Sequence, residues 1–300
     1  MSVKKLDQLI DLAKTKEKKK LVVAYGQDAH TLGAVSKAVD LGFVDVIIVA
    51  NKEIVEKVCK EEGIDPSKFE IVNEPNEISA GRKAVNLINE GKGNMLMKGL
   101  ISSDNYMRAI LNKDEGLLPA KATLSHISVF EVPTYHKLLI TSDVAVIPAP
   151  DISQKISIAN YLIKTAHRLD IENPKMALVC LSEKTNPKIQ QTVDAAIITK
   201  MADRGQIKGA IVDGPMGFDL AIDQESAQIK KFNSPVAGDA DCILWSNIEA
   251  GNVFYKTVTK LCHAELAAIV VGAKCPAILS SRGDSTKTKL YSIALAALMA

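Results

Sequence analysis

Residues 21–50 read LVVAYGQDAHTLGAVSKAVDLGFVDVIIVA, and this stretch decides the class of the fold. Residues 21–25 and 44–50 are short apolar runs, the second rich in β-branched residues, which predicts two strands. Residues 31–41 between them have the spacing of a helix. Because both strand patterns are apolar on both faces, the stretch predicts a βαβ unit of a buried parallel sheet.

The same alternation continues on the C-terminal side of this unit. Further strands are predicted at residues 69–72, 94–97, 176–181, 208–212 and 275–279. Further helices are predicted at residues 53–62, 153–169, 188–203 and 286–300. This order of elements predicts an α/β fold, and 300 residues suggest about two domains.

The rhythm of the pattern changes after Asn112. Residues 113–123 form a polar connection that contains proline and glycine, and two strands follow at 127–132 and 137–141. The few residues between these strands predict antiparallel pairing or a crossing between domains.

The composition is that of an ordinary globular protein, with a net charge of +2 that is too small to indicate nucleic-acid or membrane binding. No run of 18 apolar residues is present, and charges interrupt every apolar run at the N-terminus, so neither a membrane span nor a secretory signal is predicted. The five cysteines form no C-x-x-C pair, which predicts reduced, buried thiols in a cytoplasmic protein. They are Cys59, Cys180, Cys242, Cys262 and Cys275.

The junction before the last helix points to anion binding. The predicted strand 275–279 runs into Ser280-Ser281-Arg282-Gly283-Asp284-Ser285, and the helix begins directly afterwards. The first N–H groups of a helix are unpaired and partly positive, and Gly283 lets the backbone approach a ligand. Arg282 is one of only five arginines in the chain. The turn is therefore either an anion site or a serine-capped helix with a solvated arginine.

A second candidate loop follows the predicted strand 94–97. Lys98, Ser102 and Ser103 could hold a phosphate together with backbone N–H groups, and Arg108 follows two turns into the next helix. The alternative is an ordinary helix cap with a solvated lysine. The loop is not a P-loop, and the chain contains neither a G-x-G-x-x-G nor a G-x-S-x-G motif.

Polar residues also mark a third helix start. Asn247, Glu249 and Asn252 would either cap this helix or bind polar groups of a ligand. Asp239 and Asp241 could suggest a metal, but they are better explained as carboxylates of a turn, so no metal site is predicted. Loops at residues 26–30 and 213–219 also follow predicted strands. Ligands of parallel α/β sheets bind at the carboxyl ends of strands, so these loops are expected to converge.

Three sequence blocks resemble the phosphate acetyltransferase/phosphate butyryltransferase family. They are Ser234-Pro-Val-Ala-Gly-Asp-Ala, then Asn247-Ile-Glu-Ala-Gly-Asn252 with Tyr255-Lys256, and Ser281-Arg282-Gly283. The length resembles that of the butyryl branch. The resemblance implies an isocitrate/isopropylmalate-dehydrogenase-like fold, with two three-layer α/β domains and a cleft between them. We expect the domains at residues 1–123 with 270–300, and at 124–269.

The resemblance also implies an activity. The family converts acyl-CoA and inorganic phosphate reversibly into acyl phosphate and CoA, with no tightly bound cofactor. By resemblance, Ser281 would donate a hydrogen bond to the oxyanion of the tetrahedral intermediate. Arg282 would hold the phosphoryl oxygens, and Arg108 would be a second anion clamp. The turn with Ser281 would lie opposite the Asn247 loop, and the family generally forms homodimers or larger assemblies.

One position departs from the family pattern. Acetyl-transferring relatives carry an aspartate seven residues after this serine, where the present chain has Thr288. Asp284 could take the thiol proton instead, or it could cap the helix, so the general base stays open. Positioning and electrostatic stabilisation do not depend on this residue.

Two readings outside this activity also stay open. A metal- and NAD-dependent decarboxylating dehydrogenase of the same fold would use residues such as Asp239, Asp241 and the Tyr255-Lys256 pair. However, adjacent helical side chains point about 100° apart and do not share one centre. A non-catalytic acyl-CoA sensor is the other reading. Within the family, butyryl and acetyl transfer both fit, since one methylene changes binding by only ~1–3 kcal/mol.

Overall fold

The computed structural model describes residues 2–279 and 284–300. Within it, the chain divides into two compact units. The first unit comprises residues 7–124 and 267–300, and the second unit comprises residues 1–6 and 125–266.

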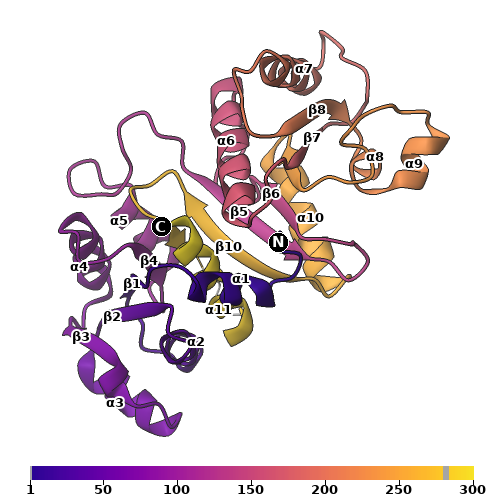
Figure 1. Cartoon of the computed structure of the whole chain (residues 1–300). Helices are drawn as coiled ribbons and strands as arrows, with labels where there is room; N and C mark the ends of the chain where they lie inside the picture. The colour runs from indigo at the N-terminus through magenta and orange to yellow at the C-terminus, as the bar shows by residue number, and fades with distance from the viewer. Residues whose placement is uncertain (1, 280–283) are drawn as a thin grey trace. The chain divides into compact units, whose positions relative to one another are not determined.

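The first unit is built on a mostly parallel sheet (Figure 1). Its strand order is β3-β2-β1-β4-β11-β10, in which only β10 runs antiparallel to its neighbour β11. The strands are β1 (Lys19–Ala24), β2 (Val44–Ala50), β3 (Phe69–Asn73), β4 (Met95–Lys98), β10 (Glu265–Val271) and β11 (Ala277–Ile278). β4 is buried throughout and β1 is buried from Leu21 to Ala24, as expected for strands covered on both faces.

Helices cover both faces of this sheet. They are α1 (Asp7–Lys14), α2 (Ala29–Asp40), α3 (Lys52–Glu61), α4 (Glu77–Asn89), α5 (Ser103–Ile110) and α11 (Thr286–Met299), with a 3₁₀ turn η1 (Pro66–Lys68). The chain passes outward from β1 through β2 to β3 and then returns to the other side of β1 to form β4. Because such crossovers are right-handed, α4 lies on the face of the sheet opposite to α2 and α3. α11 packs against α1 and α2, and α4 packs against α5. α11 is buried from Lys289 to Met299, all around its axis.

The second unit has the strand order β5-β6-β9-β7-β8. β5 and β6 are antiparallel, and the other neighbours are parallel. The strands are β5 (Ser125–Glu131), β6 (Leu139–Ser142), β7 (Lys175–Val179), β8 (Ile211–Met216) and β9 (Cys242–Trp245). The helices are α6 (Ile152–Arg168), α7 (Gln190–Asp203), α8 (Phe218–Ile222), α9 (Gln224–Ile229) and α10 (Ile248–Lys260).

The α/β class and the antiparallel pairing after Asn112 are confirmed. Two details of the sequence interpretation are wrong. Residues 213–216 belong to strand β8 rather than to a loop, although they include Asp213, Gly214 and Pro215. Cys262 is exposed, while the other four thiols are buried. None of the helices in the described part of the chain has the length and apolar character needed to cross a membrane.

Candidate functional site

Three neighbouring parallel strands of the first unit, β1, β4 and β11, end at the same edge of the sheet. A helix begins after each strand, and a side-chain oxygen caps it. The Asp28 carboxylate accepts from the N–H of Thr31 at 2.9 Å in α2. Ser102 Oγ caps α5 at 3.2 Å and Ser285 Oγ caps α11 at 3.1 Å. Each N-terminus contributes a partial positive charge, so this edge favours an anion.

The loops after β1 and β4 touch through their backbones. The N–H of Leu100 donates to the carbonyl of Tyr25 at 2.9 Å. A Cβ at Gly99 would lie 2.5 Å from that carbonyl oxygen and 2.6 Å from the Cα of Gly26. Only glycine fits at position 99, and the two loops are therefore held in one fixed arrangement.

Two lysines are buried at this edge, Lys98 at 2% and Lys289 at 3% exposure. Lys98 Nζ donates to the carbonyl of Gly99 at 3.3 Å. Burial lowers the pKa of Lys289, while the nearby carboxylates of Asp284 and Asp28 act to raise it. A buried ammonium is stable only beside carboxylates or an anionic ligand. Sequence reasoning missed Lys289, although its position directly before the apolar run of α11 was a readable signal.

The turn residues Ser281, Arg282 and Gly283 lie outside the described residues. The helix that follows them is capped by Ser285 and not by Asp284, so the reading of Asp284 as the helix cap is wrong. Asp284 is half-buried and acts on Lys289. The Thr288 hydroxyl lies 3.1 Å from Ser285 Oγ. Thr288 therefore contributes to the capping of the helix.

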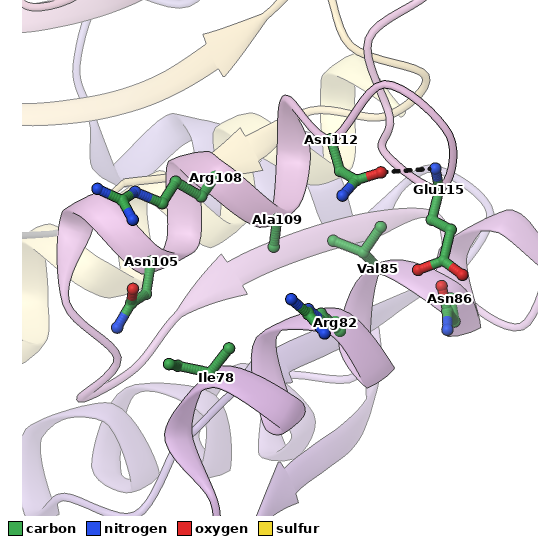
Figure 2. A pocket seen from close by; sticks show the side chains of 9 residues that line it. All are labelled: Ile78, Arg82, Val85, Asn86, Asn105, Arg108, Ala109, Asn112 and Glu115. Carbon is green, nitrogen blue, oxygen red and sulfur yellow. Dashed lines mark hydrogen bonds between the residues drawn. The ribbon is translucent and has the colours of Figure 1, made fainter.

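Arg108 lies away from this edge, in the last turn of α5. There it lines a cavity of about 210 Å³ between α4 and α5, together with Arg82 (Figure 2). Arg108 extends along its helix and pairs with Asp104 at 3.0 Å, whereas Arg82 lies between the two helices. Two of the five arginines of the chain thus border one small cavity. Sequence reasoning missed Arg82.

The other two candidates on α5 have different surroundings. Ser102 is engaged as the cap, and its own N–H donates to a carboxylate oxygen of Glu77 on α4 at 2.8 Å. Ser103 is exposed as the first residue of the helix. The cap interpretation therefore accounts for the hydroxyl of Ser102.

In the second unit, Asn247 and Asn252 have separate structural roles. Asn247 Oδ1 accepts from the N–H of Ala250 at 3.0 Å and caps α10. Asn252 Nδ2 donates to the carbonyl of Val144 at 3.0 Å, which ties α10 to the loop after β6. Asn247 and Glu249 also line a cavity of about 600 Å³. Asn247 and Glu249, but not Asn252, are therefore placed to contact a ligand in this cavity.

The loop after β6 is held rigidly by the buried carboxylate of Asp143. This carboxylate accepts from the N–H groups of Ala145, Val146 and Ile147 at 2.8, 2.9 and 3.2 Å. The N–H of Ile248 donates to the carbonyl of Pro148 at 3.0 Å. The loop is thus fixed at both of its ends. The loop and the N-terminus of α10 therefore form one pre-organised structure.

Asp239 and Asp241 belong to an ion-pair network. Lys137 lies within 2.8 Å of both carboxylates, and Lys175 lies 2.7 Å from Asp239. Burial acts to raise the pKa of Asp239, but hydrogen bonds from Lys137, Lys175 and His136 outweigh it and hold the pKa far below its usual range. Within residues 2–279 and 284–300, no group of three or more His, Cys, Asp or Glu side chains could hold a metal ion. These aspartates therefore stabilise the second unit.

The candidate residues fall into two groups, one in each unit. Lys98, Ser102, Ser103, Arg108 and Asp284 belong to the first unit. Asn247, Glu249 and Asn252 belong to the second unit. The first group surrounds a positively charged strand end and an arginine-lined cavity, which suit phosphate groups. The second group surrounds a larger cavity of mixed polarity.

The chain was compared with known families, curated proteins and solved structures. It matches the family described as phosphate acetyl/butaryl transferase over residues 5–80 and 74–297. It is 45% identical to a phosphate butyryltransferase of Clostridium acetobutylicum, over 99% of both chains. It is 38% identical to a phosphate acetyltransferase of Rhizobium meliloti, over 99% of this chain and 93% of the relative. The crystal structure of a branched-chain phosphotransacylase from Enterococcus faecalis is 28% identical. It matches with a TM-score of 0.80 over 94% of this chain and 98% of that chain.

Proposed function

Because the chain belongs to the phosphate acetyl/butaryl transferase family, we propose that it transfers a short acyl group reversibly between coenzyme A and inorganic phosphate. Butyryl transfer is the proposed main activity, since a phosphate butyryltransferase is 45% identical over nearly the full length. Acetyl transfer is the second candidate, supported by the 38% identical phosphate acetyltransferase.

The observation that carries the proposal is the positive charge at the sheet edge of the first unit where β1, β4 and β11 end. Three capped helix N-termini and the buried ammonium groups of Lys98 and Lys289 favour a phosphate at this edge. The sequence segment with Ser281 and Arg282 joins β11 to α11, both of which belong to this edge. The second anion clamp, Arg108, lines its own cavity with Arg82, and both can contact phosphate groups of coenzyme A.

The reaction requires a nucleophile, an oxyanion donor and a proton donor. A phosphate oxygen attacks the thioester carbonyl, and a tetrahedral oxyanion forms. The C–S bond then breaks, and the departing thiolate of CoA takes a proton. We assign the oxyanion contact to Ser281 and the phosphoryl oxygens to Arg282, as the family resemblance implies. We assign the proton transfer to Asp284, whose carboxylate would take the proton that the phosphate loses and pass it to the thiolate. Ser285 rather than Asp284 serves as the helix cap.

The test is to replace Ser281 by alanine and to follow thiol release from butyryl-CoA in the presence of phosphate. The loss of one oxyanion donor is expected to lower kcat by about 10²–10³ and to change KM little. Ser280→Ala, one residue earlier, is the matched control and is expected to retain wild-type turnover. Wild-type kcat in Ser281→Ala would contradict the assignment.

The same assay separates the acyl groups and the other readings. We expect kcat/KM to be higher for butyryl-CoA than for propionyl- or acetyl-CoA, and the reverse order would favour the phosphate acetyltransferase. Absence of phosphate-dependent thiol release, with retained CoA binding, would favour a sensor. Reduction of NAD would favour a dehydrogenase. The proposal includes a cytoplasmic location. It also includes assembly into a homodimer or a larger homo-oligomer, and light scattering can test this oligomeric state.

A further inference from the structure

The second unit contains a cavity of about 600 Å³, within the size range of sites that bind small organic ligands. One side of it is the apolar segment Pro148-Ala149-Pro150, continued by Ile152. Side-chain amides and a hydroxyl also line it, contributed by Gln190, Gln191, Ser246 and Asn247. The cavity therefore suits a ligand with both apolar and neutral polar groups.

A buried ion pair also lines this cavity. Lys155 Nζ of α6 lies 2.7 Å from Asp194 Oδ2 of α7, and each side chain is 5% exposed. Gln190 Nε2 donates to the other oxygen of Asp194 at 2.7 Å. An ammonium has three N–H donors, and the only bond of Lys155 Nζ among the described residues is the one to Asp194. The pair can therefore offer further N–H donors to a ligand in the cavity.

The charges around the cavity argue against an anionic ligand. Among the described residues that line it, Lys155 is the only cation, and Asp151, Asp194 and Glu249 are carboxylates. Because Asp194 already neutralises Lys155, a phosphate would meet a net negative lining. A neutral carbonyl oxygen can still accept an N–H of Lys155 without adding charge. The chemistry therefore favours a ligand that carries amide carbonyls beside an apolar group.

Hydrogen bonds within the protein hold the walls of the cavity. The loop after β6 is held by the Asp143 carboxylate, by Asn252 and by the N–H of Ile248. Asn247, whose oxygen caps α10, also lines the cavity. A pre-organised cavity binds its ligand without the entropic cost of ordering a loop.

We propose that this cavity binds the pantetheine arm of the acyl-CoA substrate. The arm is uncharged and carries two amide groups and a branched apolar carbon. Its amides suit Lys155, Gln191 and Asn247, and its methyl groups suit the Pro148–Pro150 segment. This proposal rests on the proposed acyltransferase function.

The test removes both members of the ion pair together, in the double variant Lys155→Met/Asp194→Leu, so that no unpaired charge stays buried. The matched control is Lys200→Met/Asp203→Leu, which removes an exposed pair of the same 2.7 Å length from α7. A third variant, Ala149→Trp, narrows the cavity at its exposed wall and leaves the ion pair intact. Thermal unfolding of each variant checks that the fold is retained.

Three butyryl thioesters then identify the part of the substrate that the cavity contacts. They are butyryl-CoA, butyryl-pantetheine, and butyryl-N-acetylcysteamine, which keeps only the sulfur end of the arm. In Lys155→Met/Asp194→Leu and in Ala149→Trp, kcat/KM is expected to fall about tenfold or more for the first two and to stay unchanged for the third. The control pair is expected to change none of them.

Other patterns overturn the proposal. A fall for butyryl-CoA alone would mean that the cavity contacts the nucleotide. An equal fall for all three would mean that it acts on the acyl group or on the fold, and no fall would leave the cavity without a role in substrate binding.

Calorimetric titration with pantetheine separates this proposal from the proposed function. Binding to the wild type that is lost in Lys155→Met/Asp194→Leu supports the cavity, even if the protein transfers no acyl group. Equal binding to both proteins, or no binding to either, overturns it.

Discussion

Gly251 is a residue at which a single added methyl group is expected to disturb the packing of a helix on its neighbouring loop. It lies inside α10, where the helix crosses the loop after β6. A Cβ built at this position would lie 2.3 Å from the carbonyl oxygen of Asp143, 2.9 Å from Trp245 Cδ1 and 3.1 Å from Val144 Cγ1. The nearest of these atoms is backbone and cannot rotate away. Gly251→Ala must therefore push α10 and the loop apart.

The size of the effect follows from two opposing contributions. A carbon normally approaches a carbonyl oxygen to about 3.3 Å, so the backbones must separate by about 1 Å. Overpacking costs about 1–3 kcal/mol, and the upper half of this range, about 2–3 kcal/mol, applies here because the nearest atom is backbone. Alanine gains about 1 kcal/mol over glycine in a helix. The expected net loss is about 1–2 kcal/mol of unfolding free energy, or about 2–8 °C in Tm.

Gly33→Ala is the matched control for this substitution. Gly33 also lies inside a helix, α2, but within the described part of the chain a Cβ there would meet only Thr286 Cγ2, at an ordinary contact distance of 3.8 Å. The same change is therefore expected to stabilise the protein by about 0.5–1 kcal/mol.

Urea denaturation followed by circular dichroism measures both variants, and the thiol-release assay measures kcat/KM for butyryl-CoA. Gly251→Ala is expected to unfold at lower urea concentration than the wild type and to lose activity, because the wall beside Asn247 moves. If Gly251→Ala were as stable as Gly33→Ala, the close packing of α10 on the loop would be refuted.

Three further predictions concern charges and thiols. Burial lowers the pKa of Lys289, which disfavours its charged form in the folded state, so Lys289→Met is expected to raise the unfolding midpoint at pH 7. This gain in stability should shrink as the pH approaches about 10.4, where the lysine of the unfolded chain also loses its charge. In the same variant, KM for phosphate should rise at pH 7. An unchanged KM would show that Lys289 does not belong to the site. Hydrogen bonds hold the pKa of Asp239 low, so Asp239→Asn is expected to lose stability at pH 7 and progressively less below about pH 4. A difference that stays constant down to pH 2 in acid titrations would contradict the network. A chromogenic disulfide should react rapidly with one thiol of the native protein, Cys262, and with all five in denaturant, because burial raises the pKa of Cys275 to about 12 and of Cys180 to about 11. Fast reaction that persists in Cys262→Ser would show that a buried thiol is accessible.

The helices and strands were largely readable from the sequence because their signals are local. Residues 44–50 form β2 as expected, and the predicted helix 153–169 is shifted by a single residue in α6. Strand β8 was missed in part because Asp213, Gly214 and Pro215 are typical of loops. β8 lies at the end of the strand order of the second unit, where a strand tolerates proline.

The candidate site was readable only in part, for a different reason. Asn247 and Ser102 were marked by their positions before helices, and both serve as caps. Whether a polar residue caps a helix or lines a cavity depends on elements far away in the chain. Arg82 carried no local motif, and it acquired a meaning only when α4 packed against α5.

The sequence by itself determined the alternation of strands and helices and the family of the chain, because periodicity and motif spacing are properties of neighbouring residues. Only the tertiary structure decided which charges meet. Lys289 lies near Asp28 because α11 packs against α2. Lys155 faces Asp194 because α6 and α7 both flank the second sheet. Such pairs form only when distant segments are buried together, and burial is what makes their charges matter.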